Sequence, residues 1–156
     1  MTATVQIHEM TTTDTGVDKT SGTVRFKSAN NTNVDTNDRL QIPSGADIFS
    51  YTKQLCFYFS VGPAVDVQNL RAYTDGANGF GTGIVVDYDV SASYTTATDT
   101  DIAGTDLFTA TVDASIDMDA IDTGPHTGTG YKGDYLRLQM GVSNTASPGS
   151  LSAETL

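Results

Sequence analysis

Three aspartates in one Thr/Gly-rich stretch have a spacing that could bind a cation. Asp99, Asp101 and Asp106, with Gly104 between the last two, are placed like the first ligands of a calcium-binding loop. The stretch departs from the EF-hand pattern because Ala103 stands where Asp or Asn is needed, and because no bidentate glutamate follows. These aspartates are the calcium candidates of the chain, and an ordinary acidic loop is the alternative interpretation.

Catalytic chemistry has few residues to draw on. His8 and His126 are the only histidines, and Cys56 is the only cysteine. Nucleophilic hydrolysis or a multi-histidine metal centre needs more than these scattered residues. Carboxylate pairs could cleave a glycosidic bond, but the aspartates lie mostly in loops, where this residue forms turns. The glycines within 76–83 lead into a strand rather than a helix, so they favour a loop over a phosphate site. We therefore predict a non-enzymatic protein without catalytic residues and without a cofactor.

The tyrosines offer a different kind of chemistry. On one face of a β-sandwich they could form a stacking platform for a sugar, although no tryptophan supports this interpretation. Several of them alternate in register within predicted strands, so packing at the edge of the core or at a subunit interface is the alternative. The tyrosines are Tyr51, Tyr58, Tyr73, Tyr88, Tyr94, Tyr131 and Tyr135.

Alternation of apolar and polar residues predicts the strands that must position these side chains. Four segments alternate clearly: 55–61, 84–90, 108–116 and 135–142. Weaker candidates are 4–10, 23–27 with Val24 and Phe26 inward, 65–74 and 150–156. Clusters of Gly, Thr, Asn and Asp separate these segments at 11–21, 30–38, 75–83, 94–106 and 117–130.

This spacing predicts an all-β fold, an antiparallel β-sandwich of about eight strands with jelly-roll connections. We expect residues 1–15 to form an N-terminal arm or a first strand that could reach another subunit. Residues 16–156 are expected to form a single sandwich domain.

Charge and hydropathy exclude two classes of partner. The chain has 8 basic and 19 acidic residues, which gives a net charge of −11 at pH 7. So few basic residues, spread along the chain, cannot neutralise a run of phosphates, and we predict no nucleic-acid binding. No apolar run approaches the length that spans a bilayer, so we predict no membrane partner and no processed leader.

Short segments of the chain carry a likeness to a known group. They are Thr4-Val5-Gln6-Ile7-His8-Glu9, Gly22-Thr23-Val24-Arg25-Phe26-Lys27-Ser28 and Asn69-Leu70-Arg71-Ala72-Tyr73. With the Thr/Asn/Asp-rich body, they resemble small virion proteins of tailed bacteriophages, especially the head decoration, or cement, proteins with jelly-roll or related sandwich folds. The likeness covers most of the chain and lies in its general sequence character.

The resemblance implies a place in the virion and a set of partners. Such proteins sit on the outer capsid as trimers and contact the major capsid protein, so we expect the same here, with synthesis in the host cytoplasm. The predicted interface residues are Thr4, Val5, Gln6, Ile7, His8, Tyr58 and Tyr135. Deletion of residues 2–10 is expected to abolish capsid binding or trimerisation. A phage tail, fibre or baseplate component and a carbohydrate-binding sandwich module are the alternative functions.

Overall fold

A computed structural model describes residues 3–63 and 65–147 of the chain. The described residues form an all-β antiparallel fold with a seven-stranded sheet and a second sheet of two strands, β5 and β8. The large sheet has the order β2-β1-β4-β9-β6-β7, and β3 also pairs with β9. The strands are β1 Thr4–Thr12, β2 Thr15–Asp18, β3 Ile48–Phe49, β4 Lys53–Val61, β5 Arg71–Ala72, β6 Ile84–Ser91, β7 Thr105–Asp106, β8 Ile116–Asp117 and β9 Gly130–Val142.

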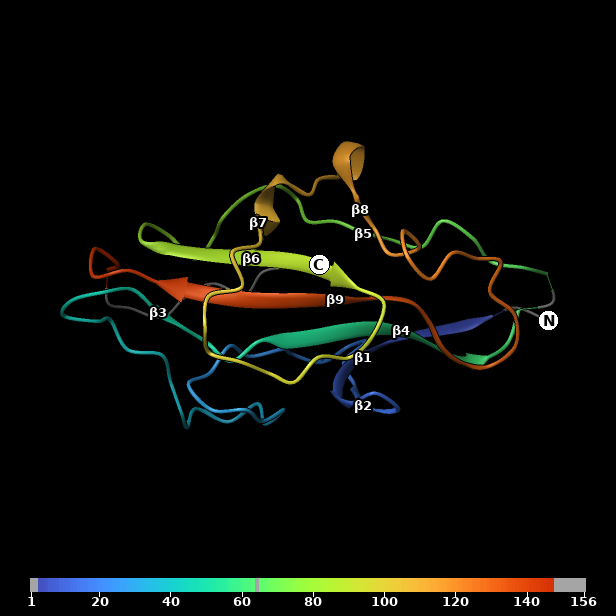
Figure 1. The fold of residues 1–156 in the computed structure, drawn as a ribbon, viewed down its shortest axis with the longest axis horizontal. Coiled ribbons are helices and arrows are strands. Elements are labelled where there is room, and N and C mark those ends of the chain that lie inside the picture. Colours follow the sequence, from blue (N-terminus) through green and yellow to red (C-terminus); the bar gives the residue numbers. More distant parts are fainter. Residues whose placement is uncertain (1–2, 64, 148–156) are drawn as a thin grey trace.

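Three long strands, β4, β9 and β6, lie side by side at the centre of the large sheet (Figure 1). They correspond to the predicted segments 55–61, 135–142 and 84–90, which are confirmed. Apolar and polar residues alternate between the two faces as expected, because residues two apart in a strand point to the same face of a sheet. The core face of β9 carries Leu136, Leu138 and Met140, and all three are buried.

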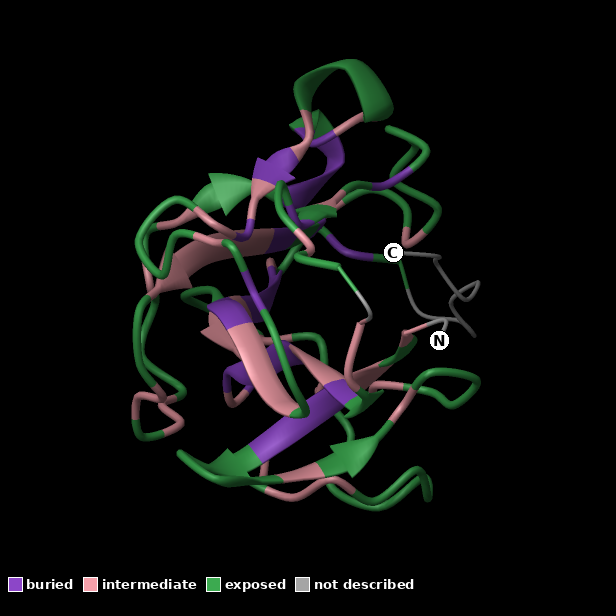
Figure 2. Ribbon diagram, turned by 90° about the vertical axis from the view of Figure 1, so that its right-hand side faces the viewer, coloured by how far each residue is buried: buried purple, intermediate pink, exposed green. Residues whose placement is uncertain are grey.

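The hydrophobic core lies between this sheet and a thinner second layer. The second layer consists of β5 and β8 with two 3-10 helices, η1 Leu107–Thr109 and η2 Val112–Ala114. It contributes the buried residues Leu70, Phe108, Ile116 and Met118, which pack against the core face of β4, β9 and β6. Buried residues therefore gather inside the molecule, and exposed loops form its periphery (Figure 2). The all-β antiparallel prediction is confirmed, whereas the jelly-roll connection remains a prediction.

The predicted strand over 108–116 is wrong. This segment forms η1 and η2 instead, and only Ile116 belongs to a strand. Asp106 caps η1 because its side-chain carboxylate accepts a hydrogen bond from Phe108 N. Phe108 and Ala110 are buried in the core although the backbone is not extended. Apolar residues at alternate positions therefore reach the core here from short turns.

The weaker predictions have mixed outcomes. Residues 23–27 are not a strand, although Val24 and Phe26 do pack against the core as expected. Within 65–74 only Arg71–Ala72 is a strand, and Val67 forms an isolated bridge with His126. The predicted turn cluster 11–21 contains the short strand β2. The predicted strand 150–156 lies outside the described residues.

The N-terminal segment is a strand of the chain's own sheet. Thr4–Thr12 forms β1, which pairs antiparallel with β4 along one side and with β2 along part of the other. This agrees with the first-strand alternative for residues 1–15. The segment therefore lies within the large sheet rather than apart from it.

A bulge in β9 brings the second layer close to the sheet. The register between β4 and β9 shifts between Leu55 and Phe57. Gly133 lies in the stretch of β9 opposite this shift with a φ of +73°, and a Cβ there would come within 2.5 Å of Met118 O. Glycine is needed at this position because other residues rarely adopt positive φ and would collide with that carbonyl. Asp134 N then donates a hydrogen bond to Met118 O at 2.6 Å, which fixes Met118 against β9.

Candidate functional site: an open strand edge and an apolar pocket

The N-terminal end of β1 has an open edge. On its side away from β4, Ile7 N donates to Thr20 Oγ1 at 3.0 Å, and Ile7 O accepts from Lys19 N at 2.7 Å. Since backbone groups two residues apart face the same side of a strand, Val5 N–H and C=O also point away from β4. The pairing of β1 with β2 begins only at His8. Within the described residues, the backbone of Val5 therefore faces outward at an unpaired edge, and the Val5 side chain is 42% exposed.

An aromatic cluster lies next to this edge on the face of the sheet away from the main core. The rings of His8 and Tyr58 stack with centroids 4.6 Å apart, and Tyr131 lies 4.9 Å from Tyr58. His8 Nδ1 and the Tyr131 hydroxyl are 3.2 Å apart, within hydrogen-bond distance. Burial raises the pKa of Tyr131, so this phenol stays protonated at neutral pH. The cluster presents half-buried aromatic surface beside Gln6.

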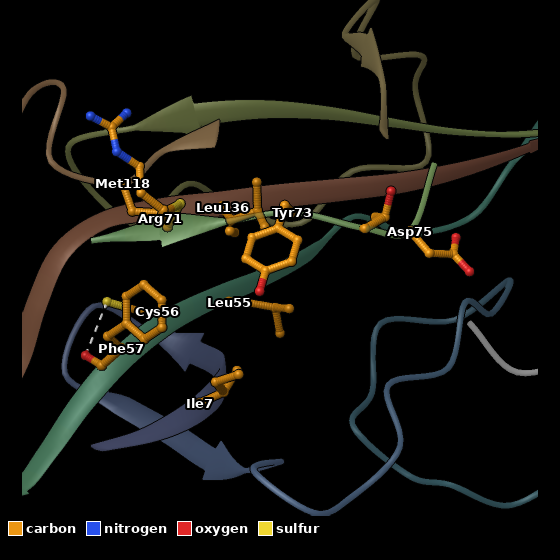
Figure 3. A pocket seen from close by; sticks show the side chains of 11 residues that line it. Ile7, Leu55, Cys56, Phe57, Arg71, Tyr73, Asp75, Met118 and Leu136 are labelled. Atoms are coloured by element: carbon orange, nitrogen blue, oxygen red, sulfur yellow. Dashed lines mark hydrogen bonds between the residues drawn. The ribbon is translucent and has the colours of Figure 1, made fainter. Parts of the chain in front are cut away.

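A pocket of about 380 Å³ lies between the large sheet and the second layer (Figure 3). Its lining is mainly apolar, with Leu55 and Leu136 from the sheet and Met118 from the second layer. The remaining lining residues are Ile7, Cys56, Phe57, Arg71, Ala72, Tyr73, Thr74 and Asp75. The lining residues come from β1, β4 and β9, from β5 with the three residues that follow it, and from Met118 directly after β8.

The polar groups of this pocket lie at its rim. Tyr73 is 49% exposed. Its hydroxyl is directed toward Leu55 and makes no hydrogen bond to the other residues that line the pocket (Figure 3). Arg71 forms an ion pair of 3.0 Å with Asp117, which neutralises the guanidinium. Asp75 Oδ1 accepts a hydrogen bond from Ala77 N, but Asp75 takes part in none of the ion pairs of the described residues.

Cys56 contributes a wall of the pocket rather than a nucleophile. Burial raises the pKa of its thiol to about 12. A thiol with this pKa is almost wholly protonated at neutral pH, and the thiolate is the reactive form. Cys56 is 2% exposed and packs with Met10 and Tyr135. Its role is therefore that of a small apolar core residue.

A second pocket, of about 330 Å³, is polar and lies between β4 and the loop at 30–33. The buried carboxylate of Glu9 lies beside it, 3.0 Å from Lys53 Nζ and 3.4 Å from Lys19 Nζ. Lys53 also donates to Asn31 O, and Lys19 donates to Thr32 O at 3.0 Å. These lysines therefore tie the loop to the sheet while they neutralise Glu9.

The same polar region is fixed from the other side by buried glutamines. Gln54 donates to Thr95 O and accepts from Thr95 N at 2.9 Å. Gln139 donates to Thr100 O at 3.0 Å and accepts from Ile102 N at 3.0 Å. The loop between β6 and β7, which crosses in front of the sheet in Figure 1, is thus bound to it through side chains. The polar groups around this pocket are largely satisfied within the chain.

The calcium candidates do not converge on one point. Among the described residues, no group of three or more His, Cys, Asp or Glu side chains could hold a metal ion. Asp101 Oδ1 accepts from Ala103 N, and Asp106 caps η1, as expected of turn-forming aspartates. Burial raises the pKa of Asp87, and the charges of Asp101 and Asp106 raise it further. The negative charges of Asp101 and Asp106 therefore disfavour the charged form of Asp87.

The predicted interface residues divide into two groups. Thr4 and Val5 are exposed, Gln6, Ile7 and Tyr58 are half-buried, and all five lie at or near the open edge of β1. Two others are buried within the chain: His8 in the aromatic cluster, and Tyr135, whose hydroxyl donates to Thr13 O at 2.9 Å. Tyr135 is 8% exposed and so leaves little surface for another chain.

The apolar pocket was missed because its residues come from separate segments. Ile7 and Phe57 belong to strands that were predicted, and their inward direction follows from alternation. The position of Ala72 and Met118 opposite them depends on the β5-β8 pairing, in which Ala72 faces Ile116. A two-residue pairing of this kind has no clear signal in the sequence.

Comparisons of the chain with protein-family models, with curated proteins and with solved structures give no match. None of the described helices is long and apolar enough to cross a membrane.

Proposed function

We propose that this chain is a non-enzymatic structural protein that binds the outer surface of a tailed-phage capsid. It stabilises the shell through contacts with the major capsid protein and with neighbouring copies of itself, as a trimer. The observation that carries the proposal is the open edge of β1 at Val5. An unpaired edge is a template on which another chain can add a strand.

The surroundings of the edge favour protein contact. Val5 and Val61 are exposed apolar side chains on adjacent strands, since Thr4 pairs with Val61 and Val5 with Phe59. The half-buried rings of Tyr58 and Tyr131 lie close by on the other face. Aromatic side chains of this kind are enriched at protein interfaces.

The distribution of charge supports a basic protein partner. Five of the eight Lys and Arg residues form ion pairs with carboxylates of the same chain: Lys19, Lys27, Lys53, Arg71 and Arg137. The remaining charged groups are mostly carboxylates, so the surface is acidic, as the net charge of −11 implies. Such a surface speeds association with a basic patch and repels nucleic acid.

Co-sedimentation with purified shells of the major capsid protein tests the proposal. The wild-type protein is expected to pellet with the shells at a fixed stoichiometry and to show a trimer mass by light scattering. Val5→Pro removes the outward N–H without removing a bond to β4, and we expect it to lose pelleting or trimerisation. Val5→Thr keeps the N–H and is the matched control, for which pelleting and mass should persist.

A wild-type monomer that stays in the supernatant with shells would overturn the proposal. In that case a tail or fibre component, or a glycan-binding module tested on a glycan array, becomes the better hypothesis. Pelleting of Val5→Pro at the wild-type level, with an unchanged mass, would show that the open edge is not the contact.

A further inference from the structure

We propose that the apolar pocket is a docking site for one large apolar side chain of a partner protein, carried on an extended basic segment. This proposal rests on the proposed function, since the partner there is the capsid protein. Three features of the pocket argue for it: its size and lining, the Tyr73 hydroxyl at its mouth, and the Asp75 carboxylate, which forms no ion pair among the described residues.

Size and lining define the side chain that fits. A cavity of about 150 Å³ lined by apolar residues can already hold a benzene molecule. The volume of about 380 Å³ therefore accommodates a Phe, Leu or Met side chain together with part of its backbone. Leu55, Met118 and Leu136, which line the cavity, are each at most 5% exposed, so they are fixed by the surrounding core. A pocket that is preformed in this way lowers the entropic cost of binding.

The hydroxyl of Tyr73 favours a hydrogen-bond acceptor beside the docked apolar side chain. It projects over the pocket from the chain after β5 and has no partner among the lining residues (Figure 3). A peptide whose apolar side chain enters the pocket would place a backbone carbonyl at the mouth. That carbonyl can accept a hydrogen bond from Tyr73, which a plain hydrocarbon could not do.

The charge at the rim defines the neighbour of the apolar residue. Arg71 is neutralised by Asp117 at 3.0 Å, whereas Asp75 has no cationic partner in the described residues. The rim is therefore net negative, as is the chain as a whole. A Lys or Arg next to the apolar residue would complement Asp75, and an acidic residue there would be repelled.

Peptide titration of the isotope-labelled protein, followed by NMR, tests the docking directly. The probes are acetylated, amidated tetrapeptides of sequence Gly-Phe-Lys-Gly, Gly-Ala-Lys-Gly and Gly-Phe-Glu-Gly. Shifts are expected at Ala72, Tyr73 and Met118. The alanine peptide should bind at least about tenfold more weakly because it leaves the pocket unfilled. The glutamate peptide should bind about two- to fivefold more weakly, as for an exposed charge pair.

Two substitutions and a matched control locate the binding. Ala72→Leu fills the pocket and should abolish the shifts, whereas the same change at the exposed Ala77 should leave them intact. Tyr73→Phe removes only the hydroxyl and should weaken binding of the Gly-Phe-Lys-Gly peptide about two- to tenfold. The Tyr73 variant and the peptide series need no change in the core, so they remain informative if Ala72→Leu folds poorly.

Equal binding of the phenylalanine and alanine peptides, or shifts confined to another surface, would overturn the docking proposal. Shell pelleting separates this failure from failure of the proposed function. If the wild type pellets and Ala72→Leu pellets equally well, the pocket is not the contact although the function stands. If the peptide binds as expected but the wild type ignores shells, the docking site stands and the capsid is not its partner.

Discussion

The two pockets of this protein have similar volumes, about 380 and 330 Å³, and opposite chemistry. The polar one is bordered by Glu9, Lys53 and Gln54, whose side chains are engaged with other parts of the same chain. The apolar one is lined by Leu55, Met118 and Leu136 and is occupied by nothing from the described residues. We therefore expect the polar pocket to contribute to stability, whereas the apolar pocket is the proposed docking site.

The largest effect is expected from Glu9→Gln beside the polar pocket. The substitution leaves Lys19 and Lys53 buried without a counter-charge, and breaking a buried ion pair by removing one partner costs about 3–5 kcal/mol. Urea unfolding should show this loss in the free energy of unfolding. Asp75→Asn at the rim of the apolar pocket is the control and should change stability by less than about 0.5 kcal/mol. Similar stabilities of the two variants would contradict the distinction between the pockets.

Gln54→Leu is expected to have the next largest effect. It leaves the backbone N–H and C=O of Thr95 without their side-chain partner, which costs about 1–3 kcal/mol. The loop between β6 and β7 should also become cleavable by protease in the native protein, because Gln54 ties it to the sheet. Wild-type stability together with wild-type resistance to protease would refute the assigned role of Gln54.

Ala72→Leu should change stability in the opposite direction. Filling an existing apolar cavity commonly raises the free energy of unfolding by about 0.5–2 kcal/mol. Ala72 lines the pocket and pairs with the buried Ile116, so its side chain faces the core. A raised urea midpoint with an unchanged slope would support the cavity, and Ala77→Leu serves as the control. A marked loss of stability would show that the space is not available to a larger side chain.

The smallest effect concerns the loop that borders the polar pocket. A hydrogen bond from Lys27, with a second from Asn37 N, holds the pKa of Asp35 below its ordinary value of 3.8. A depressed carboxylate pKa contributes stability above pH 3.8, and this contribution is lost as the pH falls below that value. Thermal unfolding across pH 2–6 should therefore show a smaller acid-side decline for Asp35→Asn than for the wild type. Superimposable profiles of the two proteins would show that the interaction of Lys27 with Asp35 does not contribute to stability.

Much of the large sheet could be predicted from the sequence, and the reason is local. In β4, β6 and β9 every second residue faces one continuous core. The apolar residues Leu136, Leu138 and Met140 therefore alternate with residues on the other face, and this alternation predicts the strand. The segment 108–116 shows the same alternation without the strand, because η1 and η2 bury Phe108 and Ala110 from turns. Alternation alone does not separate these two cases.

The candidate site was predicted only in part, because it depends on long-range geometry. Thr4 and Val5 are exposed near the unpaired edge of β1, and their contact with another chain remains a prediction. The burial of Tyr135 depends on its bond to Thr13, and the apolar pocket depends on the approach of Met118 to β9 at Gly133. Neither contact has a signal within one segment of sequence.

Amide hydrogen exchange of the shell-bound protein shows whether the open edge of β1 and the apolar pocket contact the capsid. Binding to shells is expected to protect the outward amide of Val5 and amides around Ala72 and Tyr73. Amides around Asn31 and Thr95, beside the polar pocket, should exchange as in the free protein. Protection at Asn31 and Thr95 without any at Val5 and Tyr73 would contradict the proposed contacts, because the polar pocket would then be the contact.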